Sequence, residues 1–175
     1  MKKILIFSFL FLSLVACEKI DKNTQFSINT EASFEVPANM TTQTPIELTA
    51  IPLVIDSQIF EDYKTSTDLI DKATIKNIEL QIANPQNADF DFLTDIELYI
   101  EADNLPKIRI AWRNNMQNDQ LQSFNPEYLP DNLSEYIKNN HLKMSLVLLT
   151  DEVLQQPVQF KVKTGFYIDA ELIGK

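Results

Sequence analysis

The chain has 175 residues, 25 of them acidic and 15 basic, and a formal net charge of −10 at pH 7. This balance disfavours nucleic acids and anionic lipid surfaces as partners. The sequence contains two glycines, Gly165 and Gly174, so it has neither a glycine-rich phosphate loop nor a dinucleotide-binding fingerprint.

Residues 1–16 have the form of a secretory signal sequence. Lys2 and Lys3 supply a positive start, and an apolar run broken only by serines extends from Ile4 to Leu14. This run is too short to span a bilayer comfortably and has no stop-transfer pattern. Its removal leaves 159 of the 175 residues, with 13 basic and 25 acidic side chains and a net charge of −12. Such a length favours one domain with a substantial core.

The single cysteine, Cys17, stands directly behind this segment and follows the small residue Ala16. The tetrapeptide Leu14-Val15-Ala16-Cys17 resembles the lipobox of bacterial lipoproteins. The resemblance implies that the Cys17 thiol receives a diacylglycerol, that cleavage occurs on its N-terminal side, and that the new amine is acylated. Several acyl chains anchor a protein stably, since each buried CH2 contributes about 0.8 kcal/mol. The alternative is an ordinary signal whose cleavage site includes a cysteine.

The mature chain is expected to divide into a lipidated tether over residues 17–24 and a domain over residues 25–175. As a whole it resembles small lipoproteins of Gram-negative envelopes. In that group an aspartate directly behind the cysteine favours the inner membrane, and here Glu18 occupies that position. We therefore expect an outer-membrane lipoprotein, with the periplasmic face and the cell surface both open. Because no second cysteine is present, the domain must be held together by burial.

Period-two alternation of apolar and polar residues predicts strands along the domain. The alternating apolar positions are Phe26, Ile28, Ala32, Phe34 and Val36; Ile46, Leu48 and Ala50; Ile78, Leu80 and Ile82; Ile96, Leu98 and Ile100; Ile108, Ile110 and Trp112; Leu142, Met144, Leu146 and Leu148; Val158, Phe160 and Val162; and Phe166, Ile168, Ala170 and Leu172. Seven or eight such strands predict an all-β fold, an antiparallel Ig-like β-sandwich.

One short helix is expected near residues 132–139, because Asn132 can cap it with Glu135 three residues on. Its apolar face would comprise Leu133, Tyr136 and Ile137. The stretch 56–71 is the least strand-like part of the interior and is a second candidate for a short helix.

Residues 96–113 predict a hairpin in which Glu101 lies opposite Arg109, with residues 103–107 as the loop. The other pairs would be Ile100 with Ile110, Leu98 with Trp112 and Glu97 with Arg113. Apolar side chains then face apolar ones and acids face bases. This register makes the two arginines structural partners of acids and places Trp112 in the core; the alternative for Trp112 is an exposed platform for a sugar ring.

The segments Ile78–Asn87 (IELQIANPQN) and Asp95–Ile100 (DIELYI) resemble the strand, Asn-Pro turn and strand signature of LEA14-like (water stress and hypersensitive response) domains. The resemblance covers residues 75–112 and implies a small Ig-like sandwich in which the Asn-Pro motif closes a strand. It carries no catalytic residue.

No constellation of residues points to a reaction. On a strand, the sole histidine His141 and Ser145 would be about 13 Å apart, beyond hydrogen-bond reach. Once Cys17 is acylated, the His141 imidazole is the one histidine or cysteine ligand that the sequence provides for a zinc ion. We expect no enzyme, and a hydrolase using two carboxylates is the alternative that the many acids leave open.

The densest acidic stretch provides a candidate calcium site. Its oxygen ligands would be Asn87, Asp89, Asp91 and Asp95. A calcium loop begun at Asp89 has Leu93 and Thr94 where a ligand and a glycine belong, so a solvated turn is favoured and no cofactor is expected.

The candidate rim for a ligand consists of aromatic side chains in or near predicted loops, namely Tyr63, Phe124 and Tyr128; Tyr136 is expected in the core. The expected function is binding without catalysis by a lipid-anchored envelope protein. Its partner would be another protein, reached through loops or an edge strand. Glycan binding is the alternative.

The variant Cys17→Ser tests the anchor. Serine offers no thiol for the diacylglycerol, so we expect the variant to leave the membrane fraction of lysed cells, as followed by immunoblot. The exposed-face variant Ser27→Ala serves as control and should stay with the membranes. A Cys17→Ser protein that still sediments with membranes would refute the lipobox interpretation.

Overall fold

The computed structural model describes residues 23–116, 119–139 and 141–174. The strands are β1 (Asn23–Val36), β2 (Ile46–Pro52), β3 (Ile70–Asn84), β4 (Leu93–Ala102), β5 (Leu105–Arg113), β6 (Ser123–Phe124), β7 (Glu127–Tyr128), β8 (Lys143–Thr150) and β9 (Val158–Glu171). The helices are α1 (Gln58–Asp62), the 3-10 turn η1 (Thr67–Leu69) and α2 (Ser134–Ile137). The proposed signal sequence and Cys17 lie outside the described residues.

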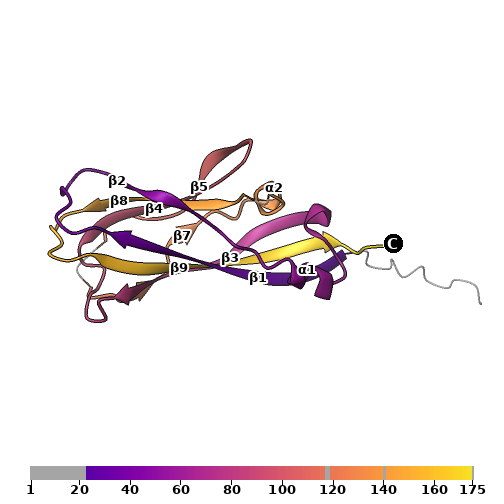
Figure 1. The fold of residues 1–175 in the computed structure, drawn as a ribbon, viewed down its shortest axis with the longest axis horizontal. Helices are drawn as coiled ribbons and strands as arrows, with labels where there is room; N and C mark the ends of the chain where they lie inside the picture. The colour runs from indigo at the N-terminus through magenta and orange to yellow at the C-terminus, as the bar shows by residue number, and fades with distance from the viewer. Residues whose placement is uncertain (1–22, 117–118, 140, 175) are drawn as a thin grey trace, which may run out of the picture.

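These strands form two antiparallel sheets stacked as a β-sandwich (Figure 1). Sheet A has the order β1-β9-β3-β6 and sheet B the order β2-β8-β4-β5-β7. The predicted all-β sandwich is therefore confirmed, with the two-residue strands β6 and β7 as additions. The short helix expected near residues 132–139 is α2, and the stretch 56–71 contains α1 and η1.

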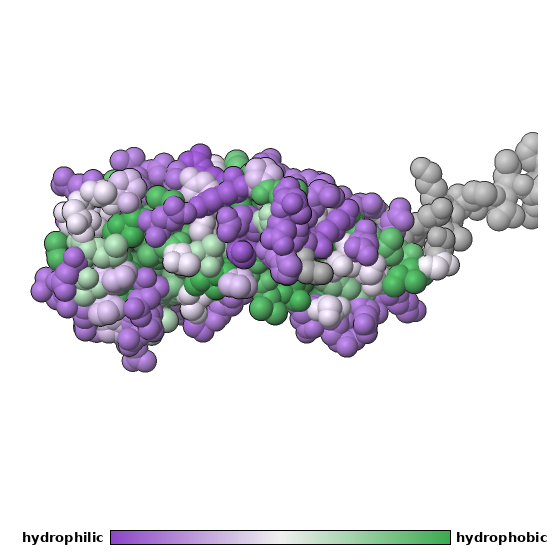
Figure 2. All heavy atoms as spheres, turned by 45° about the horizontal axis from the view of Figure 1, so that its top comes forward, coloured by the Kyte–Doolittle hydropathy of each residue, from purple (hydrophilic) through white to green (hydrophobic). Residues whose placement is uncertain are grey.

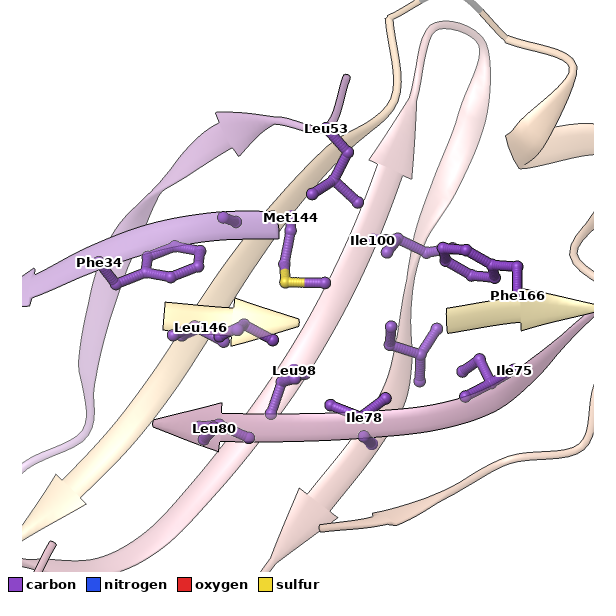
Figure 3. Close-up of a cluster of buried hydrophobic side chains, with 14 of the residues drawn as sticks. Phe34, Leu53, Ile75, Ile78, Leu80, Leu98, Ile100, Met144, Leu146 and Phe166 are labelled. Carbon is purple, nitrogen blue, oxygen red and sulfur yellow. The ribbon is translucent and has the colours of Figure 1, made fainter. Parts of the chain in front are cut away.

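The core lies between the sheets, where inward-facing side chains of both interdigitate (Figure 3). Sheet A contributes Phe34, Ile78, Leu80 and Phe166, and sheet B contributes Leu98, Ile100, Met144 and Leu146, all at most 3% exposed. Removing apolar surface from water stabilises the fold by about 25 cal/mol per Å2. No cysteine lies among the described residues, so this burial is the main source of their cohesion.

Sheet A is longer than sheet B and needs separate cover for its overhang. β1, β3 and β9 have 14, 15 and 14 residues, whereas β2, β8, β4 and β5 have seven to ten. The segment around α1 covers part of the surplus: the Phe26 ring stacks on Tyr63 at 4.5 Å and meets the edge of Phe60 at 5.5 Å. α2 covers β3 through the buried side chains of Tyr136 and Ile137.

The predicted register of the β4–β5 hairpin is wrong. Leu98 lies opposite Ala111 and Tyr99 opposite Arg109, so Ile110 is an extra residue between them. This bulge buries both Ile110 and Ala111 and moves Trp112 to the outer face, opposite Glu97. Trp112 is half-buried there and is not part of the core.

The charge pairs of this hairpin change with the register. Glu101 lies opposite Lys143 of β8, not Arg109. Arg109 instead binds the Glu97 carboxylate, and Arg113 lies over the Phe124 ring at 4.9 Å. The expected five-residue loop is also shorter, since only Asp103 and Asn104 separate β4 from β5.

Two threonines place hydroxyl groups in the core without partners. Thr30 and Thr164 face each other across the β1–β9 pair and are 5% and 1% exposed. Neither Oγ1 atom has a hydrogen-bond partner among the described residues. A buried polar group left unpaired costs about 1–3 kcal/mol, so this site reduces the stability of an otherwise apolar layer.

The variant Thr164→Val should raise the free energy of unfolding by about 1 kcal/mol, because it removes the unpaired hydroxyl and keeps the β-branched shape. Thr65→Val is the matched control. Thr65 is also 1% exposed, but its hydroxyl donates a 2.6 Å hydrogen bond to the Glu171 carbonyl oxygen, so the same substitution should lower stability. Urea denaturation measures the change in the free energy of unfolding for each variant. A change of the same sign in both variants would contradict the assignment of an unpaired hydroxyl to Thr164.

Candidate functional site

The two long edges of sheet A differ in how their backbone is covered. On one side, residues 122–133 follow the outer edge of β3. The capping hydrogen bonds join Asp71 O and Ala73 N to the Asn132 side chain, Ala73 O to Leu133 N, Lys76 O to the Tyr128 hydroxyl, Ile78 O to the Asn125 side chain, and Ile82 N to Gln122 O. β6 pairs with β3 between these contacts. This edge is closed to any further strand.

β1 forms the opposite edge of sheet A and pairs only with β9 among the described residues. Its register is regular from Asn23 to Val36, without a bulge, and its sequence contains no proline, glycine, lysine or arginine. None of the described hydrogen bonds reaches the backbone on its other side. Natural sheet edges are usually blunted by proline, by bulges or by charged side chains. Of these features β1 has only the charges of Glu31 and Glu35 along its 14 residues, so its edge is largely unprotected.

β2 is the neighbouring edge, on sheet B, and it is blunted. It has seven residues, a register shift between Leu48 and Ile51, and a proline at Pro52. A strand added to this side of the molecule would therefore pair with β1 rather than with β2.

A pocket of about 450 Å3 opens between β1 and β2, near the C-terminal end of β1. Its apolar wall comprises Phe34, Met40, Ile46, Leu48 and Ile51, and its polar rim comprises Ser33, Glu35, Glu47 and Thr49. In Figure 2 hydrophobic side chains are exposed among hydrophilic ones on the left half of the molecule, where β1 ends in Figure 1. We call this feature the β1–β2 pocket.

The rim of the β1–β2 pocket is acidic. Glu35 accepts a 2.8 Å hydrogen bond from the neutral Gln159 side chain and has no ion pair among the described residues. Glu47 pairs with Lys107. One carboxylate at the rim is thus without a cation, which favours a positively charged group beside it.

The outer face of sheet B carries a network of charged and aromatic side chains. The Tyr99 hydroxyl donates a 2.6 Å hydrogen bond to Glu97, and Arg109 binds the other carboxylate oxygen. The Arg109 guanidinium also lies 4.8 Å from the Trp112 ring centroid. These groups satisfy one another, and Arg109 covers one face of the indole.

This network shifts two pKa values. The Tyr99 hydrogen bond, aided by the Arg109 hydrogen bond and charge, holds the pKa of Glu97 below its ordinary 4.5 against an opposing effect of burial. The same hydrogen bond, together with burial, raises the pKa of Tyr99 above its ordinary 10.0. Both shifts favour the pair of a carboxylate and a protonated hydroxyl.

Three carboxylates of the candidate calcium site accept hydrogen bonds from backbone N–H groups. Asp89 Oδ1 and Asp91 Oδ1 accept backbone hydrogen bonds from Asp91 N and Gln120 N, and Asp95 Oδ1 accepts one from Asn115 N. These hydrogen bonds hold the backbone of the surrounding loops in place, as side chains do in a solvated turn. In the described part of the chain, no three His, Cys, Asp or Glu residues are grouped closely enough to hold a metal ion. As expected for the turn, Phe90, Phe92 and Leu93 are buried.

Asn87 and Asp89 line a smaller pocket of about 210 Å3 between the β3–β4 and β8–β9 loops. Glu152, Gln155 and Gln156 form the rest of its polar lining. Sequence reasoning did not find these three, because no pattern connects loops more than 60 residues apart.

The structure divides the predicted aromatic rim. Tyr63 and Tyr128 are 43% and 39% exposed, but Phe124 is 5% exposed and belongs to the core, where its ring meets Phe90 edge-on. Tyr63 stacks on Phe26 and Tyr128 caps β3, so they lie on different elements and form no common rim. Tyr136 is buried as predicted.

His141 lies in the turn before β8, where its Nδ1 contacts the Asp103 carboxylate. Ser145 is buried within β8, and the two are not joined by a hydrogen bond. No helix in the described ranges is long and apolar enough to cross a membrane.

No protein-family model and no curated protein matches this chain. Among solved structures, that of Desmodium yellow mottle tymovirus is similar at 10% identity over 87% of this chain and 91% of that one, with a TM-score of 0.33. The structure of turnip yellow mosaic virus at 100 K is similar at 13% identity over 87% and 98%, with a TM-score of 0.33. Similarity this low supports no inference about fold or function.

The variant Tyr99→Phe should raise the pKa of Glu97 towards its ordinary 4.5, because the main cause of the lowering is lost. A carboxyl with a lowered pKa stabilises the fold above its unfolded value and loses that contribution as pH falls through the folded value. The variant should therefore be less stable than the wild type near pH 7, with the difference fading below about pH 4. Carboxyl NMR titration and urea denaturation at several pH values measure this.

Tyr136→Phe is the control for this prediction. The Tyr136 hydroxyl donates to the neutral Pro106 carbonyl oxygen at 2.7 Å, so its removal should cost the same stability across the acid range. An equal pH dependence for both variants would contradict the assigned role of Glu97.

Proposed function

We propose that this protein is a lipid-anchored, non-enzymatic envelope protein that binds another protein by taking up an extended segment along the free edge of β1. The observation that carries the proposal is the difference between the two edges of sheet A. The β3 edge is capped along residues 71–82, whereas β1 offers 14 unbulged residues. Adding a strand to an open edge is a general mode of peptide recognition, in which main-chain hydrogen bonds supply affinity.

The position of β1 relative to the proposed anchor supports this function. β1 begins at Asn23, beside the end of β9, and reaches the β1–β2 pocket at Ser33 to Pro37 (Figure 1). Asn23 and Phe34 are eleven residue steps apart (34 − 23) along an extended strand, a distance of roughly 36 Å. A domain anchored through Cys17 would thus carry this pocket at the end remote from its tether. The lipobox resemblance and Glu18 behind the cysteine favour the outer membrane.

Site-specific photo-cross-linking in cells tests the proposal. A photoreactive amino acid is introduced into the full-length chain at Ser33, on the open edge, or at the equally exposed Ser123, on the capped edge. We expect a discrete protease-sensitive adduct from position 33 and none from position 123. Equal adducts at both positions, or none at position 33, would refute edge recognition.

Glycan binding is the second candidate, because the bulge in β5 places Trp112 on an outer face beside hydrogen-bonding side chains. The same experiment distinguishes it when the photoreactive group stands at position 112. Adducts there that a protease leaves intact and a glycosidase removes would favour the glycan; their absence excludes this face.

A further inference from the structure

We infer that the β1–β2 pocket receives one large apolar side chain from an extended segment that alternates apolar and basic residues. This inference rests on the proposed function and adds the chemistry of the partner. It depends on three properties of the pocket: its apolar wall, its acidic rim and its position at one end of β1.

The apolar wall sets the first requirement. In a strand added beside β1, every second side chain points towards the space between the sheets. Near Phe34 that space opens into about 450 Å3 next to Met40 and Ile51. A space of this size holds one large side chain, which would be covered on the protein side and remain open to solvent on the other. An aliphatic or aromatic side chain at one inward position would cover the partly buried Met40 and Ile51.

The rim sets the second requirement. Side chains next to the inserted one point outward from sheet A, on the same side as Glu35 of β1. Among the described residues, the Glu35 carboxylate accepts a hydrogen bond from the neutral Gln159 and has no ion pair, so a lysine or arginine there would supply a counter-charge. Electrostatic complementarity of this kind also accelerates encounter with an acidic protein.

The charge pattern argues against a second copy of this chain as the occupant. The β1 strand of another copy would bring Glu31 and Glu35 and no basic residue. Two such strands would place carboxylates near carboxylates, within proteins of net charge −12 after removal of residues 1–16. A basic segment of a different polypeptide has the opposite sign and satisfies the rim.

The tether of the same chain cannot reach the pocket once residues 1–16 are removed. Residues 17–22 span at most about 21 Å when fully extended, and the pocket lies roughly 36 Å along β1 from Asn23. After this cleavage the tether is excluded as the occupant, which favours a segment of another molecule.

The test uses the full-length lipidated protein in detergent and three fluorescent nine-residue peptides. The first alternates lysine with valine and has phenylalanine at the central inward position. The second replaces that phenylalanine by alanine, and the third replaces all lysines by glutamate. Fluorescence anisotropy should show binding of the first peptide, with roughly tenfold weaker binding of the second and no binding of the third.

Variants locate the binding in the pocket. Glu35→Gln should weaken binding of the first peptide roughly threefold to tenfold, and Thr49→Trp, which places a bulky side chain at the rim, should abolish it. Glu79→Gln is the matched control, because Glu79 lies on β3, which β9 separates from the β1 edge, and pairs with Lys163. Its affinity should equal that of the wild type.

Equal binding of the first and third peptides, equal loss for Glu35→Gln and Glu79→Gln, or no binding at all would overturn the inference. Its failure is separable from that of the proposed function. Adducts at position 33 without peptide binding would keep edge recognition and remove only the apolar-basic chemistry, whereas loss of both would remove edge recognition as well. A dimer whose interface cross-links through position 33 would replace the basic partner by a second copy.

Discussion

The packing of two inner sheet faces against each other is the constraint on which the rest of the structure depends. Each strand must direct every second side chain into one layer about 10 Å thick, and no disulfide among the described residues can compensate for a strand that fails to do so. Where a strand carries an extra residue, the alternation reverses and a bulge must absorb it. The bulges in β3 and β5 are consequences of this requirement.

The same requirement explains which strands the sequence predicts. β1 keeps strict alternation from Phe26 to Val36 and β4 from Ile96 to Ala102, and their core positions follow from it. In β3 the buried residues Ile70, Ala73, Ile75, Ile78 and Leu80 are spaced by three, two, three and two, because register shifts interrupt the strand. The period-two pattern in the sequence therefore predicts only the second half of β3. In β5 one bulge sufficed to move Trp112 from the expected core to the outer face.

The candidate site was less predictable than the fold. A strand's own residues show whether its edge is blunted, and the absence of lysine and proline from β1 is visible in the sequence. Whether an edge is covered depends on distant segments: Tyr128 and Asn132 cap β3 residues that lie 52 and 61 positions earlier in the sequence. Phe124 was misjudged for the same reason, since its two-residue strand is too short for a pattern and its partners come from β3 and the β3–β4 loop.

The place of β9 in the sheet order has a consequence for how the chain is assembled. β9 lies between β1 and β3 in space, yet it follows every other strand in the sequence. During synthesis, β1 emerges more than 120 residues before β9, the strand that pairs with it, and β3 ends 74 residues before β9 begins (158 − 84). Half of the molecule can close only when its final strand arrives, so contacts of high sequence separation govern the folding rate. A chain interrupted before Val158 would leave two long strands exposed at once, which makes completion of the C-terminal segment the step that protects the protein from aggregation.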